Sequence, residues 1–168
     1  ADLCRAIGLR MGGKKNIEGD DISGQLAVEY GRDYDELAHI LSNDKDFAAL
    51  LKYKRVRLIN PQKGIITRKT VPEIWGVKAS QMIDYLMLEG DDVDNIPGVD
   101  GVGAKTAVKL LAEYKRCEDI PAEAFPKRHR DPESFKRLRK QFKLTRQLVT
   151  IRLDTVKYDL RKLKRGPV

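Results

Sequence analysis

The sequence of 168 residues contains few of the side chains that build common metal and redox sites. Its two cysteines, Cys4 and Cys117, and its two histidines, His39 and His129, lie far apart in the chain. None of them has a second cysteine or histidine at the spacing of a zinc site, so neither a zinc site nor a disulfide framework is predicted. Histidine-based catalysis is not expected either, since both histidines lack partners.

Long hydrophobic runs are also missing. No apolar stretch approaches the roughly 20 residues that a membrane-spanning helix needs, and the first residues lack the ordered regions of a secretory signal. Aromatic residues make up only 7% of the chain, yet 41% of it is hydrophobic and 35% is charged, which is typical of a globular protein. At 19.1 kDa the chain is predicted to fold as essentially one unit.

Acidic residues are scarce in the C-terminal part of the chain. Residues 1–100 carry 14 Lys and Arg against 17 Asp and Glu, a net charge of −3, whereas residues 101–168 carry 19 against 8, a net charge of +11. The basic positions include Lys127, Arg128, Arg130, Lys136, Arg137, Arg139, Lys140, Lys143 and Arg146. Such an excess is typical of a protein that binds a polyanion, although a solvated helix face is the alternative.

The first part of the chain alternates between helical and strand patterns. Apolar spacing predicts a helix over residues 20–31, a buried strand over residues 37–41 and one or two helical turns over residues 45–51. Residues 56–67 are predicted to form a hairpin whose turn is at residues 61–64. This alternation indicates an α/β layer with a parallel sheet.

The rest of the chain is predicted to be helical. Thr70 is a plausible N-cap, and residues 79–89 have the apolar spacing of an amphipathic helix. Residues 148–153 alternate between apolar and polar side chains and could return as a strand. At the other end, residues 1–8 resemble the end of a helix, followed by an irregular or strand segment to Asn16. The predicted architecture is an α/β core joined to a helical module.

Three acidic clusters lie at the boundaries of predicted elements. They are Glu18-Gly19-Asp20-Asp21, Asp44-Lys45-Asp46 and Asp91-Asp92-Val93-Asp94. Ligand sites in α/β folds form at the carboxyl ends of strands, where the first two clusters can meet. Converging carboxylates repel one another unless cations neutralise them. Magnesium is the expected cation, because it prefers oxygen ligands, and a pair of such ions about 4 Å apart can hydrolyse a phosphodiester.

Each acidic cluster also has an ordinary explanation. Acidic residues favour helix N-termini and turns, so any one cluster alone indicates nothing more. An EF-hand is excluded, because residues 91–94 do not begin the 12-residue pattern of alternating ligands that ends in a glutamate.

Residues 95–107 form a glycine-rich segment with a basic sequence after it. A phosphate-binding P-loop is excluded because Ala104 separates Gly103 from Lys105, and the dinucleotide fingerprint fails because Thr106 replaces its third glycine. The segment fits a tight turn between two helices, the second beginning near Gly103. Free N–H groups at that helix start, with Lys105 and the Thr106 hydroxyl, could hold a phosphate of a nucleic-acid strand. A purely structural turn is the alternative.

Three motifs together resemble those of a known family. IEGDD (17–21), SNDKDF (42–47) and LEGDDVDNIPGVDGVGAKTAVKLL (88–111) are similar to the metal-binding and helix–hairpin–helix motifs of the 5′ nucleases. This family of flap endonucleases and 5′–3′ exonucleases includes the 5′-nuclease domain of bacterial DNA polymerase I and related phage enzymes. The resemblance covers nearly the whole chain. It implies a partial, PIN-like parallel-sheet nuclease core over residues 1–69 and a helix–hairpin–helix (H3TH) module with a basic tail over residues 70–168.

The resemblance also implies roles for individual residues. The catalytic and metal-binding positions that match the family are Glu18, Asp20, Asp21, Asp44, Asp46, Asp91 and Asp94. The positions that match its DNA grip are Gly101, Gly103, Lys105 and Thr106. The implied cofactors are two Mg²⁺ ions, for which Mn²⁺ can substitute, and a K⁺ ion at the hairpin.

The function implied is hydrolysis of phosphodiesters in DNA, near 5′ ends or at branched junctions, during replication or repair. The implied partner is duplex DNA with a 5′ end or flap, without a membrane or a nucleotide cofactor, and the implied protein is a cytoplasmic monomer from a bacterium or a phage-infected cell. Family members begin with an Asp-bearing strand and a basic helical arch, but only 17 residues precede Glu18, so we expect an excerpt of a longer protein. The alternative is a non-catalytic module that binds duplex DNA through the hairpin and basic tail.

Overall fold

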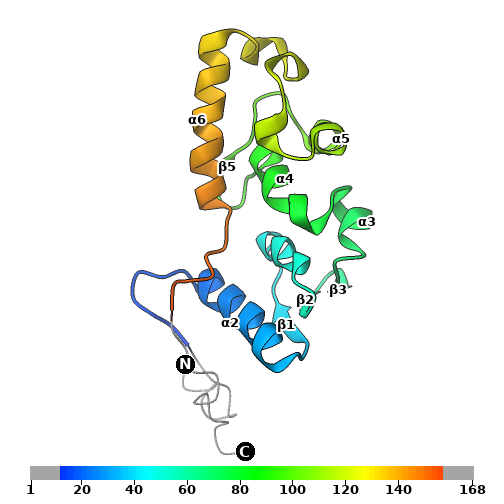
Figure 1. Ribbon diagram of the computed structural model, residues 1–168, viewed down its shortest axis with the longest axis vertical. Coiled ribbons are helices and arrows are strands. Elements are labelled where there is room, and N and C mark those ends of the chain that lie inside the picture. Colours follow the sequence, from blue (N-terminus) through cyan, green and yellow to red (C-terminus); the bar gives the residue numbers. More distant parts are fainter. Residues whose placement is uncertain (1–11, 157–168) are drawn as a thin grey trace, which may run out of the picture.

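The computed structural model describes residues 12–156 of the chain, and its elements form an elongated molecule (Figure 1). The helices are α2 (Gly19–Tyr34), α3 (Val71–Trp75), α4 (Met82–Glu89), α5 (Ala104–Tyr114) and α6 (Pro132–Leu148). The strands are β1 (Ala38–Leu41), β2 (Val56–Asn60), β3 (Gly64–Ile66), β4 (Gly90–Asp91) and β5 (Ile96–Pro97). Short 3-10 helices span Asp46–Lys52, Ala79–Gln81, Cys117–Asp119, Ala122–Ala124 and Lys127–His129.

Helix α2 confirms the first helix predicted from the sequence, but it continues past Gly31, where the prediction ended. Gly31 is a packing position instead of a stop, because a Cβ atom there would lie 2.6 Å from the Cβ of Arg55. The helix ends at Asp35, which adopts the left-handed backbone conformation with φ of 52°. The missing side chain at Gly31 therefore lets the segment before β2 lie against the helix.

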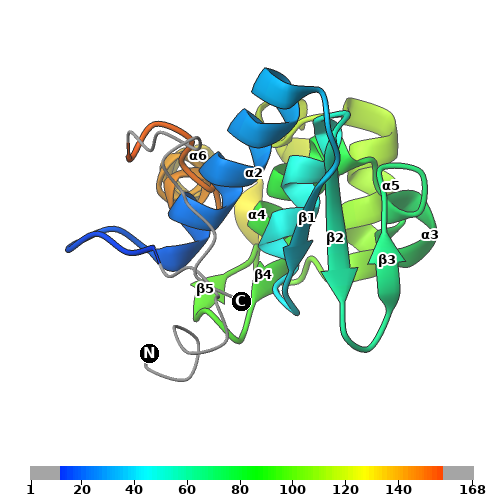
Figure 2. The ribbon, with the colours of Figure 1, turned by 90° about the horizontal axis from the view of Figure 1, so that it is seen from below.

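The sheet is small and mixed. Its order is β1-β2-β3, with β1 and β2 parallel and β2 and β3 antiparallel (Figure 2). The hairpin predicted over residues 56–67 is confirmed, and its turn is closed by the Asn60 side chain, which accepts hydrogen bonds from the backbone N–H groups of Gln62 and Lys63 at 3.0 and 2.9 Å. Within residues 12–156, the prediction of a parallel sheet is therefore correct for one pair of strands, β1 and β2.

A continuous hydrophobic core joins the sheet to the helices that follow. Leu58 of β2 and Ile66 of β3 are each 1% exposed and belong to the same buried cluster as Leu86 and Met87 of α4. Buried residues on both sides of residue 70 pack together, and the division into residues 1–69 and 70–168 stays a prediction. Within residues 12–156, no helix combines the length and hydrophobicity required to cross a bilayer.

The expectation that everything after residue 70 is helical is wrong. Strands β4 and β5 pair antiparallel between α4 and α5, with Gly90 opposite Pro97 and Asp91 opposite Ile96. Two glycines allow this pairing: Gly90 has φ of 88°, and a Cβ atom on Gly98 would lie 2.2 Å from the carbonyl oxygen of Glu89. A short β-loop, and not a simple turn, therefore connects the two helices and carries Asp91 and Asp94.

The strand considered possible at residues 148–153 does not form. Helix α6 continues to Leu148, and residues 149–156 form neither helix nor strand. The backbone N–H groups of Arg152, Thr155 and Val156 bond to side chains of α2 instead of to a neighbouring strand. At the other end, residues 12–16 are irregular, while the helix predicted over residues 1–8 and the last part of the basic tail lie outside the described residues.

Candidate metal centre and nucleic-acid interface

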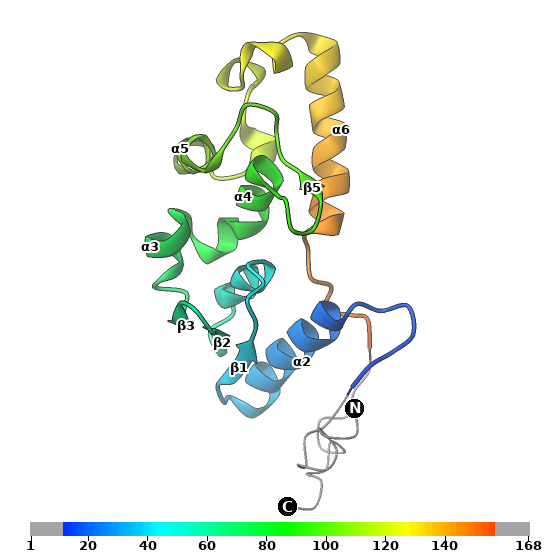
Figure 3. The ribbon, with the colours of Figure 1, turned by 180° about the vertical axis from the view of Figure 1, so that it is seen from behind.

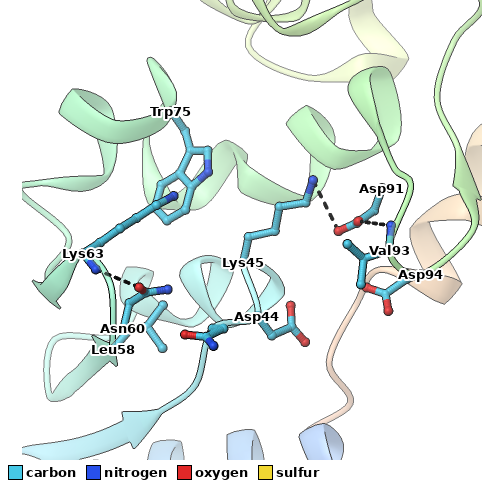
Figure 4. Close-up of a pocket in the computed structure, with 10 residues that line it drawn as sticks. Asp44, Lys45, Leu58, Asn60, Lys63, Trp75, Asp91, Val93 and Asp94 are labelled. Carbon is cyan, nitrogen blue, oxygen red and sulfur yellow. Dashed lines mark hydrogen bonds and ion pairs between the residues drawn. The ribbon is translucent and has the colours of Figure 1, made fainter.

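Carboxylates from separate parts of the chain meet beside the carboxyl end of β1. One oxygen each of Asp44, Asp46 and Asp94 lies within 4.8 Å of the others. Asp44 and Asp46 lie in the turn that follows β1, and Asp94 lies in the loop between β4 and β5. Figure 4 shows Asp44 and Asp94 from these two segments. The structure thus brings together two of the three acidic clusters, 48 residues apart in sequence between Asp46 and Asp94.

The turn after β1 holds its two acidic residues in a fixed arrangement. The Asp44 N–H donates to the Ser42 hydroxyl at 3.0 Å, and the Asp46 N–H donates to Asp44 Oδ1 at 2.8 Å. Such local bonds from short polar side chains are typical of turns. They place both carboxylates on the same side of the chain, which explains the alternating Asp-Lys-Asp pattern.

Burial and mutual repulsion act strongly on this group of carboxylates. Burial, and next the charges of Asp44 and Asp94, raise the pKa of Asp46 to about 7. Burial also raises the pKa of Asp44. The Asp46 Oδ1 atom is buried and has no hydrogen-bond partner among the described residues. A buried carboxylate oxygen without a donor, surrounded by like charges, is the environment that a hard cation relieves.

The first acidic cluster divides between two environments. Burial is the main cause that raises the pKa of Asp20, followed by the charges of Asp44, Glu18, Asp94 and Asp21, so Asp20 lies near the acidic cluster. Asp21 is in a different position. It is 3% exposed, and its two oxygens accept hydrogen bonds from the Arg152 N–H and Nε–H, each at 2.7 Å. The structure therefore places Asp20 near the cluster, Glu18 exposed at the N-cap of α2, and Asp21 against the guanidinium of Arg152.

Asp91 is close to the cluster but already has a cationic partner. Its Oδ1 accepts a hydrogen bond from the Val93 N–H at 3.0 Å, and its Oδ2 lies 3.3 Å from the Lys45 Nζ. Lys45 also reaches the Gly90 carbonyl at 3.4 Å. The sequence analysis did not predict this role of Lys45. The feature that could have indicated it is the position of this lysine between Asp44 and Asp46.

An open cavity of about 410 Å³ adjoins the acidic cluster. Its lining residues are Asn43, Asp44, Lys45, Leu58, Asn60, Lys63, Trp75, Asp91, Val93 and Asp94. On the side away from the acids, the Lys63 Nζ lies 5.1 Å from the centre of the Trp75 ring (Figure 4). The cavity thus has one acidic wall and one wall that carries a cation and an aromatic ring. Its size and polarity suit a small polar ligand.

The predicted DNA-binding residues lie together at the start of α5. Gly101 has φ of 81°, Gly103 is the N-cap, and Lys105 and Thr106 are exposed in the first helical turn. A Cβ atom on Gly103 would meet nothing within 4 Å, so the backbone here is open to close approach. The first N–H groups of a helix have no partner within it and attract anions.

The basic residues divide into two groups. Four arginines make contacts inside the protein: Arg128 with Asp100, Arg130 with the Phe125 carbonyl, Arg139 with the Glu118 carbonyl, and Arg146 with Asp84 and Glu118. In contrast, Lys136, Lys140 and Lys143 line a shallow hollow along α6 and make no ion pair with any described residue. The accessible positive surface of α6 therefore consists of these three lysines together with Arg137, which is exposed and lines the same hollow.

The sequence of this chain is similar to those of a known protein family. The family described as 5′-3′ exonuclease, C-terminal SAM fold, matches residues 77–168. The thermostable DNA polymerase I of Thermus filiformis is 43% identical over 103 residues, which are 61% of this chain and 12% of the relative. The 5′-3′ exonuclease of Aquifex aeolicus is 34% identical over 120 residues, 71% of this chain and 41% of the relative. The chain spans less than half the length of these two relatives.

Solved structures share the fold. The 5′-exonuclease of bacteriophage T5 with bound zinc has a TM-score of 0.70 and 23% identity, covering 88% of this chain and 55% of the phage protein. A flap endonuclease of the same phage, in a complex with DNA and metal ions, has a TM-score of 0.74 and 22% identity over 89% of this chain and 55% of that protein.

Proposed function

The chain belongs to the 5′-3′ exonuclease family, and from this premise we propose that it is part of a divalent-metal-dependent nuclease that hydrolyses phosphodiesters at 5′ ends or flaps of DNA. The observation that carries the proposal is the group formed by Asp44, Asp46 and Asp94. Their carboxylate oxygens lie within 4.8 Å of one another, and one buried oxygen of Asp46 has no donor within residues 12–156. Such a group is stable as charged carboxylates only when a cation is bound.

The donor set fits a hard divalent cation. All available ligand atoms are carboxylate oxygens, which Mg²⁺ prefers and Mn²⁺ accepts. Asp44, Asp46 and Asp94 would hold one ion. Asp20, which is near Asp44 and Asp94, would complete a second site with Glu18 at the N-cap of the same helix. A bound ion of this kind lowers the pKa of a water molecule and stabilises the oxygen that leaves phosphorus.

Other residues of the chain orient the substrate and the site. Lys45 neutralises Asp91 and holds the loop between β4 and β5 against the turn after β1. At the start of α5, the helix N–H groups, Lys105 and Thr106 bind a backbone phosphate without contacting a base edge. The duplex would thus be held by its backbone. This suits an enzyme that recognises the ends and junctions of DNA and not a particular base sequence.

The hairpin before α5 also belongs to the proposed DNA-binding region. The grip includes Gly101 and Gly103, and a K⁺ ion could bind carbonyl groups of this hairpin. Of these carbonyls, that of Val99 accepts from the Val102 N–H at 2.8 Å, and that of Asp100 lies 2.9 Å from His129 Nε2. The two relatives are a DNA polymerase I and a 5′-3′ exonuclease of bacteria. We further propose a monomer that acts on DNA during replication or repair in the cytoplasm of a bacterial or phage-infected cell.

The test is cleavage of a flapped DNA duplex with Mg²⁺ or Mn²⁺, comparing the unmodified chain with an Asp44→Asn, Asp46→Asn double variant. We expect the variant to lose at least about 100-fold in cleavage rate because the charges that hold the cation are removed. Duplex binding in EDTA, measured by fluorescence anisotropy, should change by less than about twofold because the grip is elsewhere.

The competing function is a module that binds duplex DNA without cleaving it, which the positive surface of α6 favours. The two functions are separated by metal binding. The nuclease proposal expects the unmodified chain to bind Mn²⁺ and the double variant to lose that binding. A chain that binds duplex DNA, binds no Mn²⁺ and leaves every flapped substrate intact would establish the binding module instead.

A further inference from the structure

The segment that follows α6 runs back across the molecule to α2. We call residues 149–156 the strap. Figures 1 and 3 both show it passing from the end of α6 to the N-terminal half of α2, which is the helix that presents Glu18 and Asp20. The strap thus connects the basic helix of the proposed DNA grip to the helix beside the acidic cluster.

Two buried polar side chains, one helical turn apart on α2, hold the strap. Both oxygens of Asp21 are used by Arg152: Oδ1 accepts from the backbone N–H at 2.7 Å, and Oδ2 accepts from Nε–H at 2.7 Å and lies 2.6 Å from Nη2. Gln25 is 3% exposed, and its Oε1 accepts from the backbone N–H groups of Thr155 and Val156 at 3.0 and 3.1 Å. Three strap amides therefore bond to two α2 side chains.

Packing supports the same attachment. A Cβ atom on Gly24 would lie 2.6 Å from the Ile151 Cγ2 atom, so the glycine between Asp21 and Gln25 makes room for the strap. Val149 and Val156, at the two ends of the strap, are 1% and 6% exposed. The strap is thus a packed connection with defined contacts along its length.

The same geometry separates Asp21 from the acidic cluster. Among residues 12–156, the group able to hold a metal ion consists of Asp44, Asp46 and Asp94. Asp21 lies next to Asp20 in sequence, but successive residues on an α-helix point in directions about 100° apart. The carboxylate of Asp21 is also already neutralised by a guanidinium, whereas one oxygen of Asp46 has no donor in the part of the chain that the structure describes.

We propose that Asp21 is a positioning residue that fastens the strap to α2 through Arg152 and so fixes the basic helix α6 relative to the metal centre. The inference rests on the proposed function for its consequence, because the strap matters to cleavage only if α6 holds the DNA and the cluster holds the cation. The attachment itself is independent of that function.

Hydrogen exchange measures the attachment directly. In Asp21→Asn and in Arg152→Gln, we expect the strap amides of Arg152, Thr155 and Val156 to exchange at least about tenfold faster, because both variants break the same contact. Arg152→Lys keeps the positive charge and the backbone bond. Its loss of protection, measured as the logarithm of the exchange rate, should be at most half of the loss in Arg152→Gln. The double variant should exchange no faster than either single variant, since both remove one interaction.

Metal binding separates positioning from ligation. Asp21→Asn and Arg152→Gln should bind Mn²⁺, measured by electron paramagnetic resonance, within about threefold of the unmodified chain, whereas Asp46→Asn should bind at least about tenfold more weakly. The unmodified chain should also bind duplex DNA more tightly with Mn²⁺ than without it. We expect Asp21→Asn to lose most of this enhancement while it keeps each binding separately, a result that a simple loss of stability would not give.

Two results would overturn the inference. One is weaker Mn²⁺ binding in Asp21→Asn with normal binding in Arg152→Gln, which would make Asp21 a ligand; the other is unchanged exchange of the strap amides in both variants. If Asp21→Asn fails to fold, Arg152→Gln decides the question, because it leaves the carboxylate intact. Absence of Mn²⁺ binding in the unmodified chain would refute the proposed nuclease, while the exchange experiment would still test the strap.

Discussion

At the scale of single residues, Asp46 and Asp21 illustrate two ways in which a protein can bury a carboxylate. Asp21 is paired with Arg152 and is neutralised inside the protein. One oxygen of Asp46 has no donor among the described residues, and burial, followed by the charges of Asp44 and Asp94, raises the pKa of Asp46 to about 7 from an ordinary 3.8. The arrangement at Asp21 stabilises the fold, whereas the arrangement at Asp46 is unfavourable until a cation binds.

The raised pKa of Asp46 predicts how stability depends on pH. The folded protein keeps a proton on Asp46 up to about pH 7, whereas the unfolded chain releases it near pH 4, so the metal-free protein should lose stability as pH rises between these values. Raised pKa values at Asp44 and Asp20 act in the same direction. In EDTA we expect Tm to fall from pH 5 to pH 8.

Asp46→Asn is the matched variant for this prediction. It should flatten the fall and stabilise the metal-free protein at pH 8 by about 1–2 kcal/mol, because it removes a buried charge. Mg²⁺ added at pH 8 should raise the Tm of the unmodified chain and leave that of the variant nearly unchanged. Thermal unfolding followed by circular dichroism measures all three effects, and a Tm in EDTA that increases from pH 5 to pH 8 would contradict the interpretation.

At the scale of elements, the loop between α4 and α5 shows why the glycines of this chain have different roles. Gly98 lies against the backbone of Glu89 and allows β4 and β5 to pair, which places Asp91 and Asp94 beside the turn after β1. Gly103 lies in open space at the start of α5. The first glycine is required by packing inside the protein, and the second leaves room for something outside it.

This difference gives a prediction with an internal control. Gly98→Ala should destabilise the protein by about 2–4 kcal/mol, because its Cβ atom would lie 2.2 Å from a backbone oxygen and force β4 and β5 apart. Gly103→Ala should change the free energy of unfolding by less than about 0.5 kcal/mol but should weaken duplex binding. Urea denaturation and fluorescence anisotropy measure the two quantities, and equal destabilisation by both substitutions would refute the assigned roles.

At the scale of the whole molecule, charge is separated along the chain and in space. Residues 1–100 have a net charge of −3 and residues 101–168 a net charge of +11. The acids lie at the carboxyl end of β1, and the accessible lysines lie on α5 and α6 in the other part of the elongated molecule (Figure 1). One part is thus suited to cations and the other to the phosphates of DNA.

Binding through phosphates predicts a steep dependence on salt. Affinity for duplex DNA should fall linearly on a double-logarithmic plot against salt concentration, and Lys105→Ala should reduce the slope by about 1. The variant should weaken binding to duplexes of different sequence about equally, because no base is read. Lys54→Ala, which removes an exposed lysine before β2, is the control and should leave slope and affinity unchanged. A sequence-dependent loss in Lys105→Ala would contradict the backbone grip.

The sequence by itself determined the helix, strand and hairpin order up to residue 67, because these elements depend on local apolar spacing and turn residues. It also marked Asp44, Asp46 and Asp94 as candidate ligands and the segment around Gly103 as a helix start. Only the tertiary structure decided which carboxylates are paired inside the protein. Arg152 is 131 residues from Asp21, and no local pattern encodes which of two adjacent acids on a helix will face a cation and which will face a distant arginine.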